Sequence, residues 1–305
     1  MNKAKIVGIG ACVMDTLITV PRFPDEDTKL RAESTVLAGG GPAATGIVAA
    51  SKLGESCAFI GVLSDDSSGH FLKEDFEKYG VNCDNIDLLS GYRAFTSCIW
   101  LSRESTSRTC VFDKGNLPPL VLDEDKKQAI KDAQILMVDG NELPAAIEAA
   151  KIARENGTKV LYDAGGLYPG IEELLPHVDI LIPSKEYALG FTKAQTVEKA
   201  AKILYDKFSP EVVVITMGKS GGILYDGNAV ITYPIYPAEV VDSNGAGDVF
   251  HGAFAAALVK GFDYEKACHF SSAVSGIKCM NVGARQSVPD FETTKEYLRR
   301  NGYEL

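Results

Sequence analysis

Short apolar runs recur along the chain, and several are apolar at almost every position rather than at alternate ones. Such runs are typical of strands whose two faces are both covered by helices. The runs that predict strands are residues 6–10, 58–62, 135–138, 159–163, 180–183, 212–216 and 222–225.

Between these runs lie longer segments with helical patterns. The predicted helices are residues 42–53, 69–79, 143–156, 196–208, 247–260 and 264–278. Two of them end beside glycine, at Gly54 and Gly157, where a helix commonly stops. The regular alternation predicts an α/β fold with a doubly wound, mostly parallel central sheet flanked by helices.

Two segments break this alternation. Residues 14–38 carry two prolines and an acidic run before an alternating stretch, and residues 92–113 have a hairpin pattern with a polar turn at 102–108. Both are rich in β-branched and aromatic residues. We therefore expect a small antiparallel β lid, formed by 14–38 and 92–113, over the mouth of a single α/β domain that spans residues 1–305.

Composition excludes several classes of partner. The 305 residues carry a formal net charge of −10, which does not suit a nucleic-acid partner because that requires basic clusters. The seven cysteines are scattered without a Cys-x-x-Cys pair, which indicates reduced thiols in a cytoplasmic protein and argues against zinc. No apolar run approaches the ~20 residues that span a bilayer, so we expect no membrane partner.

The strongest chemical signal is the run Asp-Ser-Asn-Gly-Ala-Gly-Asp at residues 242–248. The backbone N–H groups of Gly245, Ala246 and Gly247 can approach an anion in this turn, and the dipole of the following helix favours negative charge there. Asp248 can accept a proton from an attacking hydroxyl, so the motif supplies the parts of a phosphoryl-transfer centre. The alternative is that Asp248 is only the N-cap of the helix.

Three further segments have both a chemical and a purely structural interpretation. The glycines of residues 39–45 could present backbone amides to a polyol or simply precede a helix. Asp15 could bind hydroxyl groups or cap a turn. The glycine-rich turn at residues 216–222 follows a strand, at an edge where α/β proteins bind ligands, and could also be a plain hairpin connection.

Two nucleotide-binding motifs are excluded. Gly218-Lys219-Ser220 resembles the end of a Walker A loop, but that loop requires glycine where Val213 stands. Gly8-Ile9-Gly10 follows the first strand, but a dinucleotide fingerprint requires glycine where Val13 stands. The chain is therefore predicted to be neither a Walker-type NTPase nor a dehydrogenase.

The motifs resemble the two signatures of the ribokinase-like (PfkB-type) carbohydrate kinases, and the resemblance extends over nearly the whole chain. Residues 242–248 resemble the C-terminal signature, with Asn244 where threonine is commoner, and residues 39–45 with 61–69 resemble the N-terminal one. The resemblance implies a ribokinase-like fold and transfer of phosphate from ATP, with Mg²⁺, to a sugar hydroxyl. It also implies a monovalent cation, usually K⁺, beside the anion hole, and a lid that pairs two subunits into a homodimer.

The resemblance assigns a role to each matching residue. Asp248 would be the general base, and the amides of Gly245, Ala246 and Gly247 would form the anion hole. Substrate hydroxyls would be bound by Asp15, Gly40 and Gly41. The ATP contacts would come from Thr216, Gly218, Gly221 and Ser272. The matching positions of the cation site, several of which contribute only main-chain oxygens, are Asp242, Asn244, Lys278, Asn281, Gly283 and Ser287.

The chain departs from the family pattern in two places. The Asn-x-x-Glu element that orients metal and phosphate should follow Pro183, but here Ser184 replaces the asparagine and Glu186 lies one position early. We expect these two residues to act on ATP, with Glu186 working through water and magnesium. Thr45 stands where ribokinases usually carry a substrate-binding asparagine, so we expect a substrate other than ribose.

The residues of these motifs are most similar to those of the sulfofructose kinase branch of the family. Lys29 matches a lysine that binds the substrate anion in that branch, whereas Phe112 and Asn141 stand where it uses asparagine and arginine. Without that arginine, strong recognition of a sulfonate or phosphate is not expected. We expect a neutral or weakly anionic sugar, such as a ketohexose, near Lys29, Thr45 and Asn141. A nucleoside acceptor and a non-catalytic sensor of sugar or nucleotide are the alternatives.

Overall fold

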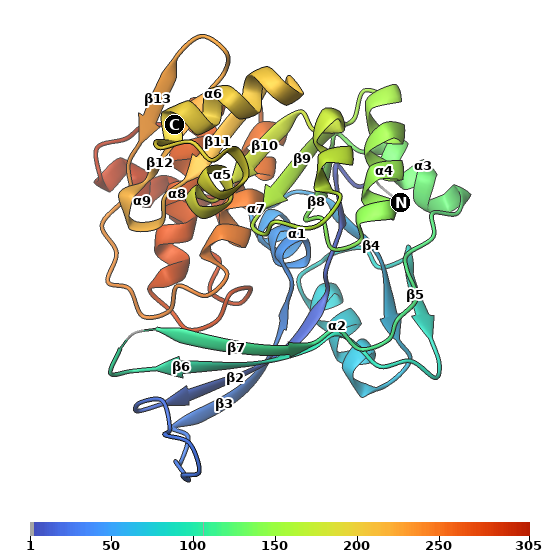
Figure 1. Ribbon diagram of the computed structural model, residues 1–305, viewed down its shortest axis with the longest axis vertical. Helices are drawn as coiled ribbons and strands as arrows, with labels where there is room; N and C mark the ends of the chain where they lie inside the picture. Colours follow the sequence, from blue (N-terminus) through green and yellow to red (C-terminus); the bar gives the residue numbers. More distant parts are fainter. Residues whose placement is uncertain (1–2, 106) are drawn as a thin grey trace.

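Parallel strands that are apolar on both faces build the central sheet of this computed structural model, which describes residues 3–105 and 107–305 (Figure 1). The strand order is β13-β12-β11-β10-β9-β8-β1-β4-β5, and β12 and β13 alone run antiparallel to their neighbours. The strands are β1 (Ile6–Ile9), β4 (Cys57–Ser64), β5 (Ile86–Leu89), β8 (Ile135–Val138), β9 (Lys159–Ala164), β10 (Ile180–Pro183), β11 (Val212–Thr216), β12 (Gly222–Tyr225) and β13 (Val230–Tyr233).

Helices cover both faces of the sheet, and each face has its own apolar core. Successive residues of β4 alternate between the two cores, with Phe59 in one and Ala58 and Ile60 in the other. The first core is completed by α1 (Pro42–Lys52), α2 (Ser67–Lys78), α7 (Ala246–Val259), α8 (Tyr264–Cys279) and α9 (Phe291–Arg300). The second is completed by α3 (Glu124–Asp132), α4 (Leu143–Glu155), α5 (Lys185–Thr192) and α6 (Val197–Phe208). The doubly wound α/β prediction is confirmed.

Helices α1 and α7 approach each other closely because small residues line their contact. A Cβ atom at Gly252 would lie 2.0 Å from the carbonyl oxygen of Gly46, so no larger residue fits at this crossing. The surrounding positions of both helices are largely buried alanines. Close packing of the two helices brings their N-termini to one edge of the sheet, at the carboxyl ends of the parallel strands.

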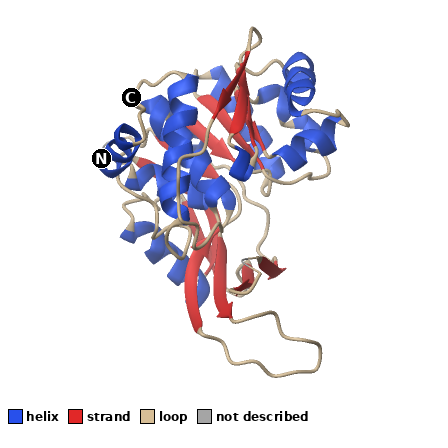
Figure 2. Ribbon diagram, turned by 90° about the vertical axis from the view of Figure 1, so that its left-hand side faces the viewer, coloured by secondary structure: helices blue, strands red, loops and turns tan. Residues whose placement is uncertain are grey.

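A second sheet of four strands projects from the α/β body (Figures 1 and 2). It contains β2 (Val13–Val20), β3 (Ser34–Gly40), β6 (Thr96–Ser102) and β7 (Arg108–Asp113), in the order β3-β2-β6-β7. The expected lid is therefore present, but the prediction that it is antiparallel is wrong, because β2 and β6 pair in parallel. After β3, the chain passes through the α/β body and re-enters the lid at the end where β2 begins. Strand β6 therefore runs in the same direction as β2.

None of the helices in residues 3–105 and 107–305 is long and apolar enough to cross a bilayer.

Candidate active site

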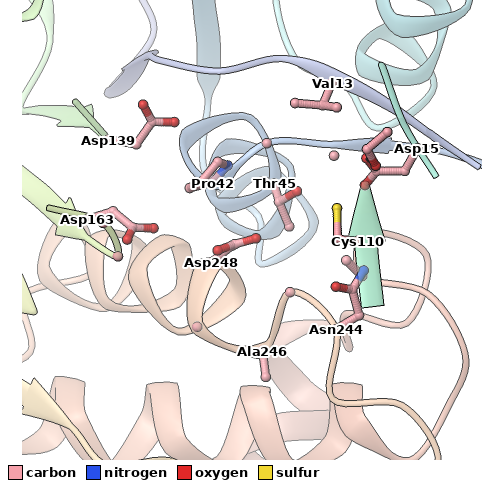
Figure 3. Close-up of a pocket in the computed structure, with 18 of the residues that line it drawn as sticks. Val13, Asp15, Pro42, Thr45, Cys110, Asp139, Asp163, Asn244, Ala246 and Asp248 are labelled. Carbon is pink, nitrogen blue, oxygen red and sulfur yellow. The ribbon is translucent and has the colours of Figure 1, made fainter. Parts of the chain in front are cut away.

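A cavity of about 510 Å³ lies between the lid and the carboxyl edge of the central sheet (Figure 3). Its walls come from the lid strands, the ends of β9, β10 and β11, and the N-termini of α1 and α7. In Figure 3, Asp248 lies between Asp15 of the lid and Asp163 at the end of β9. This is the edge at which ligands bind in doubly wound sheets.

The turn before α7 presents backbone to the cavity. Gly245 is the N-cap and has φ 72°, a left-handed conformation that glycine adopts without strain. A Cβ atom added to Gly247 would meet no atom within 4 Å, so this face of the turn is open. The N–H of Ala246 makes only a long bond of 3.3 Å to the oxygen of Ser243. The N-terminus of α7 thus offers amide donors and a positive dipole end to an anion.

Asp248 is in the first turn of α7, and its carboxylate is free to act in the cavity. The helix has no side-chain cap bond, so the alternative that Asp248 serves as the N-cap is wrong. Burial raises the pKa of Asp248, and the positive charges around it lower the pKa. These charges come from His251 on α7, Arg108 on β7, Lys278 on α8 and Arg285 after α8.

A buried pair that the sequence did not reveal, Asp163 and His251, faces Asp248. The Nδ1 atom of His251 lies 3.1 Å from a carboxylate oxygen of Asp163 and 2.6 Å from the oxygen of Gly247, and its Nε2 atom lies 3.0 Å from the oxygen of Ile182. Burial lowers the pKa of His251, whereas the carbonyls and Asp248 raise it. The pKa of Asp163 is raised by burial and by the charge of Asp248. The imidazole therefore lies between the end of β10 and the first turn of α7, close to Asp163 at the end of β9.

The lid side of the cavity carries Asp15. Strand register places Asp15 opposite Ser97, whose hydroxyl donates to Asp15 Oδ1 at 2.6 Å. Burial raises the pKa of Asp15. A Cβ atom at Gly40 would lie 2.0 Å from Asp15 Oδ2, so glycine at this position leaves room for the carboxylate. The interpretation of Asp15 as a turn cap is wrong, since the residue lies within β2.

Thr45 lies in α1 and also lines the cavity. Its Oγ1 atom is buried and has no hydrogen-bond partner among the residues that the structure describes. Gly41, one residue before α1, has φ 96°, and a Cβ atom there would lie 2.0 Å from the oxygen of Ala11. Glycine at this position lets the start of α1 reach the lid strands.

Two of the residues predicted to bind the substrate, Asn141 and Lys29, do not have side chains facing the cavity beside Asp248. The side chain of Asn141 donates to Asp139 at 3.1 Å and to the hydroxyl of Tyr168 at 3.4 Å, so it supports two residues of the cavity wall. Lys29 is exposed in the connection between β2 and β3 and, among the described residues, does not line the cavity. In this arrangement neither side chain reaches the space beside Asp248.

The lid contributes a cation that the sequence analysis assigned to a turn. Residue 108 begins β7 rather than ending the preceding loop, and the Arg108 guanidinium donates to the side-chain oxygen of Asn244. Arg108, Asn244 and Asp248 all line the cavity. No pattern in the sequence distinguished Arg108, because its partner is 136 residues away.

The predicted ATP residues lie on the opposite side of the cavity from the lid. Thr216 and Ser184 line it, at the ends of β11 and β10. Ser184 also caps α5, where its Oγ accepts the N–H of Tyr187 at 3.1 Å. Gly218 and Gly221 form the turn between β11 and β12, which confirms the hairpin interpretation of this segment, and neither glycine lines the cavity.

Two more residues of the ATP group lie outside the cavity wall. Glu186 is exposed in the first turn of α5. Ser272 is buried in α8, where its hydroxyl donates to the oxygen of Pro234 at 2.7 Å. The Ser272 hydroxyl therefore fixes the chain that follows β13.

The residues assigned to the monovalent cation gather beside the α7 turn. The Asp242 carboxylate accepts the N–H groups of Asn244 at 2.8 Å and Gly283 at 2.7 Å. Asn281 donates its N–H to the oxygen of Lys278 at 3.2 Å. The Ser287 hydroxyl donates to the oxygen of Val282 at 2.8 Å. The grouping predicted from the sequence is therefore present as one cluster of loops.

Residues 3–290 match the family model described as pfkB family carbohydrate kinase. The chain belongs to this family. As a pfkB family member it is an ATP-dependent carbohydrate kinase, a phosphotransferase with an alcohol group as acceptor. The site at the α7 N-terminus and the lid above it lie within the matched residues.

Two relatives match more than nine-tenths of the chain. It is 28% identical over 297 residues to a ribokinase of Haemophilus influenzae, covering 95% of this chain and 97% of that one. It is 26% identical over 292 residues to a ketohexokinase of Mus musculus, covering 92% and 97%. These pfkB family relatives differ in their sugars, so the family alone does not decide the acceptor.

Solved structures share the fold. A ribokinase of Thermotoga maritima superposes with a TM-score of 0.83 at 26% identity, covering 97% of this chain and 99% of that one. A ribokinase of Arabidopsis thaliana, complexed with ribose and ATP, gives a TM-score of 0.85 at 24% identity, covering 98% and 99%. A third relative, from E. coli, was solved with ATP and Mg²⁺ and gives 0.84 at 20% identity, covering 97% and 99%. The ribokinase-like fold is confirmed.

Proposed function

We propose that this kinase transfers the γ-phosphoryl group of MgATP to a primary hydroxyl of a sugar held between the lid and α7. The observation that carries this proposal is the position of Asp248. Its carboxylate does not cap the helix, lines the cavity beside the open turn of residues 245–247, and lies between Asp15 and Asp163 (Figure 3).

The transfer would proceed by one in-line displacement. The Asp248 carboxylate takes the proton of the sugar hydroxyl, whose oxygen forms a bond to the γ-phosphorus. The bond from that phosphorus to the β,γ-bridging oxygen breaks, and ADP leaves. The amides of Gly245, Ala246 and Gly247 stabilise the charge that develops on the transferred group. Arg108 and the closed lid exclude water, so that ATP is not hydrolysed instead.

We propose that MgATP lies along the carboxyl ends of β10 and β11. Thr216 and the turn glycines Gly218 and Gly221 would border its phosphates and adenosine, and Ser272 would shape the wall near adenine. Ser184 would contact the phosphates. Glu186 would act on magnesium through water, since its carboxylate is exposed outside the cavity wall.

The acceptor would be a neutral or weakly anionic sugar. Asp15, the unpartnered hydroxyl of Thr45 and the backbone of Gly40 and Gly41 can bind its hydroxyl groups. The lid adds apolar side chains to this part of the cavity, among them Val13, Phe95, Ile99 and Phe112. Asn141 would orient the wall through Asp139 and Tyr168. Lys29 would reach the sugar only when the connection between β2 and β3 closes over the cavity.

We propose a ketohexose as the acceptor rather than ribose. Thr45 at the position of the usual ribokinase asparagine and the wording of the motifs favour the sulfofructose kinase branch. The relatives reported above are ribokinases and a ketohexokinase, and the position of Asn141 leaves no arginine for a sulfonate. A ketohexose satisfies the apolar and hydroxyl-binding character of the cavity.

We further propose that residues 1–305 form one domain and that its lid, about residues 14–38 and 92–113, pairs two copies of the chain. The edge strands of the lid carry exposed apolar side chains, Val36 and Leu37 on β3 and Val111 on β7, of which Val111 is 70% exposed. Exposed apolar side chains of this kind are common at interfaces. All seven cysteines are free, which supports a reducing, cytoplasmic compartment.

A screen of purified protein with MgATP against sugars and nucleosides tests the proposed acceptor, with ADP release as the readout. Turnover is expected with ketohexoses above ribose and above every nucleoside. The proposal is contradicted if nucleosides give the highest kcat/KM, or if ligands raise the melting temperature while no acceptor supports turnover.

The pH dependence of kcat/KM should report the environment of Asp248. Burial raises the pKa of Asp248 above its ordinary value of 3.8. Protonation removes the base, so kcat/KM is expected to fall as pH falls through this raised pKa, with an apparent value shared with Asp163. A profile that stays flat down to about pH 4 would contradict an aspartate base in this site.

The monovalent cation implied by the resemblance does not fit the residues of this chain. The main-chain oxygen of Asp242 accepts the Lys278 ammonium at 2.7 Å, and the side-chain oxygen of Asn244 accepts Arg108. No step of the proposed transfer therefore uses a bound K⁺.

A further inference from the structure

Lys278 is a lysine without solvent exposure beside the phosphoryl-transfer turn. It lies in the last turn of α8, and its side chain is 0% exposed. A lysine is almost never buried to this extent unless a partner compensates its charge. Its partner is Asp242, the first residue of the motif that leads into α7.

The ammonium of Lys278 lies near both the main-chain oxygen and the carboxylate of Asp242. Its Nζ atom donates to the main-chain oxygen of Asp242 at 2.7 Å and lies 3.9 Å from Asp242 Oδ2. The Asp242 carboxylate in turn accepts the N–H of Asn244 from its own loop and the N–H of Gly283 from the loop after α8. One buried ion pair thus connects both loops that support the α7 turn.

Main-chain bonds add to the same connection. The N–H groups of Val241 and Asp242 donate to the oxygen of Cys279 at 2.8 Å and 3.1 Å. The loop before α7 is therefore fixed to the end of α8 by contacts that the chain makes itself. An added cation could order these loops only by replacing the ammonium at the oxygen of Asp242.

Charge also disfavours a further cation here. Lys278, Arg108 and Arg285 all lie close enough to Asp248 to lower its pKa. Arg285 is buried and paired with Asp75 at 2.7 Å, and like charges in a poorly solvated region repel strongly. The positive potential that supports the transferred phosphoryl group is therefore already supplied by side chains.

We propose that the Lys278 ammonium is a built-in cation that takes the place of a bound monovalent cation, so that phosphoryl transfer in this chain does not require K⁺. This inference rests on the proposed kinase function of the same site. Lys278 acts as a positioning residue: it holds Asp242 and thereby the turn whose amides receive the phosphoryl group.

The activity test compares potassium, sodium and tetramethylammonium chloride at equal ionic strength. The wild-type kcat is expected to be the same in all three salts within about twofold, well below the effect of losing one stabilising group in an active site. Lys278→Ala is expected to lose about tenfold or more in tetramethylammonium and to recover part of this loss in K⁺ or ammonium. A wild-type kcat that rises several-fold with K⁺ overturns the proposal.

Three matched variants separate charge from packing. Lys278→Met fills the same space without a charge and is expected to lose activity with no recovery in K⁺. Lys278→Arg keeps the charge and is expected to stay independent of K⁺. Lys260→Ala removes a lysine paired with Glu55 at 2.7 Å and is expected to create no K⁺ dependence. Equal recovery of Lys278→Ala and Lys278→Met in K⁺ would overturn the role of the ammonium.

Thermal unfolding followed by circular dichroism gives a readout that needs no acceptor. The melting temperature of the wild type is expected to be equal in K⁺ and tetramethylammonium, whereas that of Lys278→Ala is expected to rise in K⁺. If the acceptor screen finds no turnover while these shifts are observed, the proposed sugar acceptor fails and the structural role of the Lys278 ammonium stands. A wild-type melting temperature that rises with K⁺ but not with tetramethylammonium overturns the proposal that Lys278 replaces the cation.

Discussion

Replacing Asp248 with asparagine is expected to lower kcat by about 10²–10⁴-fold while MgATP still binds. The substitution keeps the shape of the side chain in the first turn of α7 but removes the group that accepts the hydroxyl proton. The helix should form normally, because Gly245 rather than Asp248 is its N-cap. Steady-state kinetics gives kcat, and isothermal titration calorimetry measures ATP affinity.

Asp66→Asn provides the matched control for this variant. Asp66 is also an acidic residue at a helix start, and its carboxylate accepts the N–H groups of Ser68 and Gly69 at 3.0 Å. Asparagine serves equally well as an N-cap, so kcat is expected to stay at the wild-type level. A kcat near wild type in Asp248→Asn would remove Asp248 from the role of base.

Replacing Asp15 with alanine is expected to raise the KM for the sugar by about 10–100-fold, as expected for hydrogen bonds to a charged group. The KM for ATP should change little, because Asp15 lies on the lid side of the cavity and the ATP residues lie on the other. Ser97→Ala removes the 2.6 Å hydrogen bond that orients Asp15 and is expected to give a smaller rise in the same direction.

Steady-state kinetics with each substrate varied in turn separates the two KM values. Equal increases in both would indicate a general loss of structure rather than a lost sugar contact. An unchanged KM for the sugar in Asp15→Ala would remove Asp15 from the acceptor site.

The central sheet could be predicted from sequence because its strands are local apolar runs. The helices that escaped prediction, such as α3 and α9, are short and strongly polar, and β5 is an edge strand in which only Ile86 is buried. The lid strands were found, but their directions were not, because the parallel pairing of β2 and β6 depends on the path of the intervening chain. Local pattern carries no information about that path.

The residues of the candidate active site also fall into those that the sequence predicted and those that it did not. Asp248 and the glycine turn were predicted from one contiguous motif and Asp15 from the family resemblance, and all of them line the cavity. Arg108 and the Asp163–His251 pair could not, since their partners come from distant segments. Lys278 was predicted as one position of the cation site, and its side-chain ammonium donates to the main-chain oxygen of Asp242.

The close crossing of α1 and α7 has a consequence for how the enzyme can move. In the proposed reaction the N-terminus of α1 borders the sugar and that of α7 borders the phosphoryl group, and the two helices touch so closely at Gly46 and Gly252 that no side chain fits between them. The sugar and ATP would therefore both be positioned by the same tightly packed pair of helices. A change of shape during turnover is then expected in the lid strands, and its extent would decide how tightly the two reactants are enclosed.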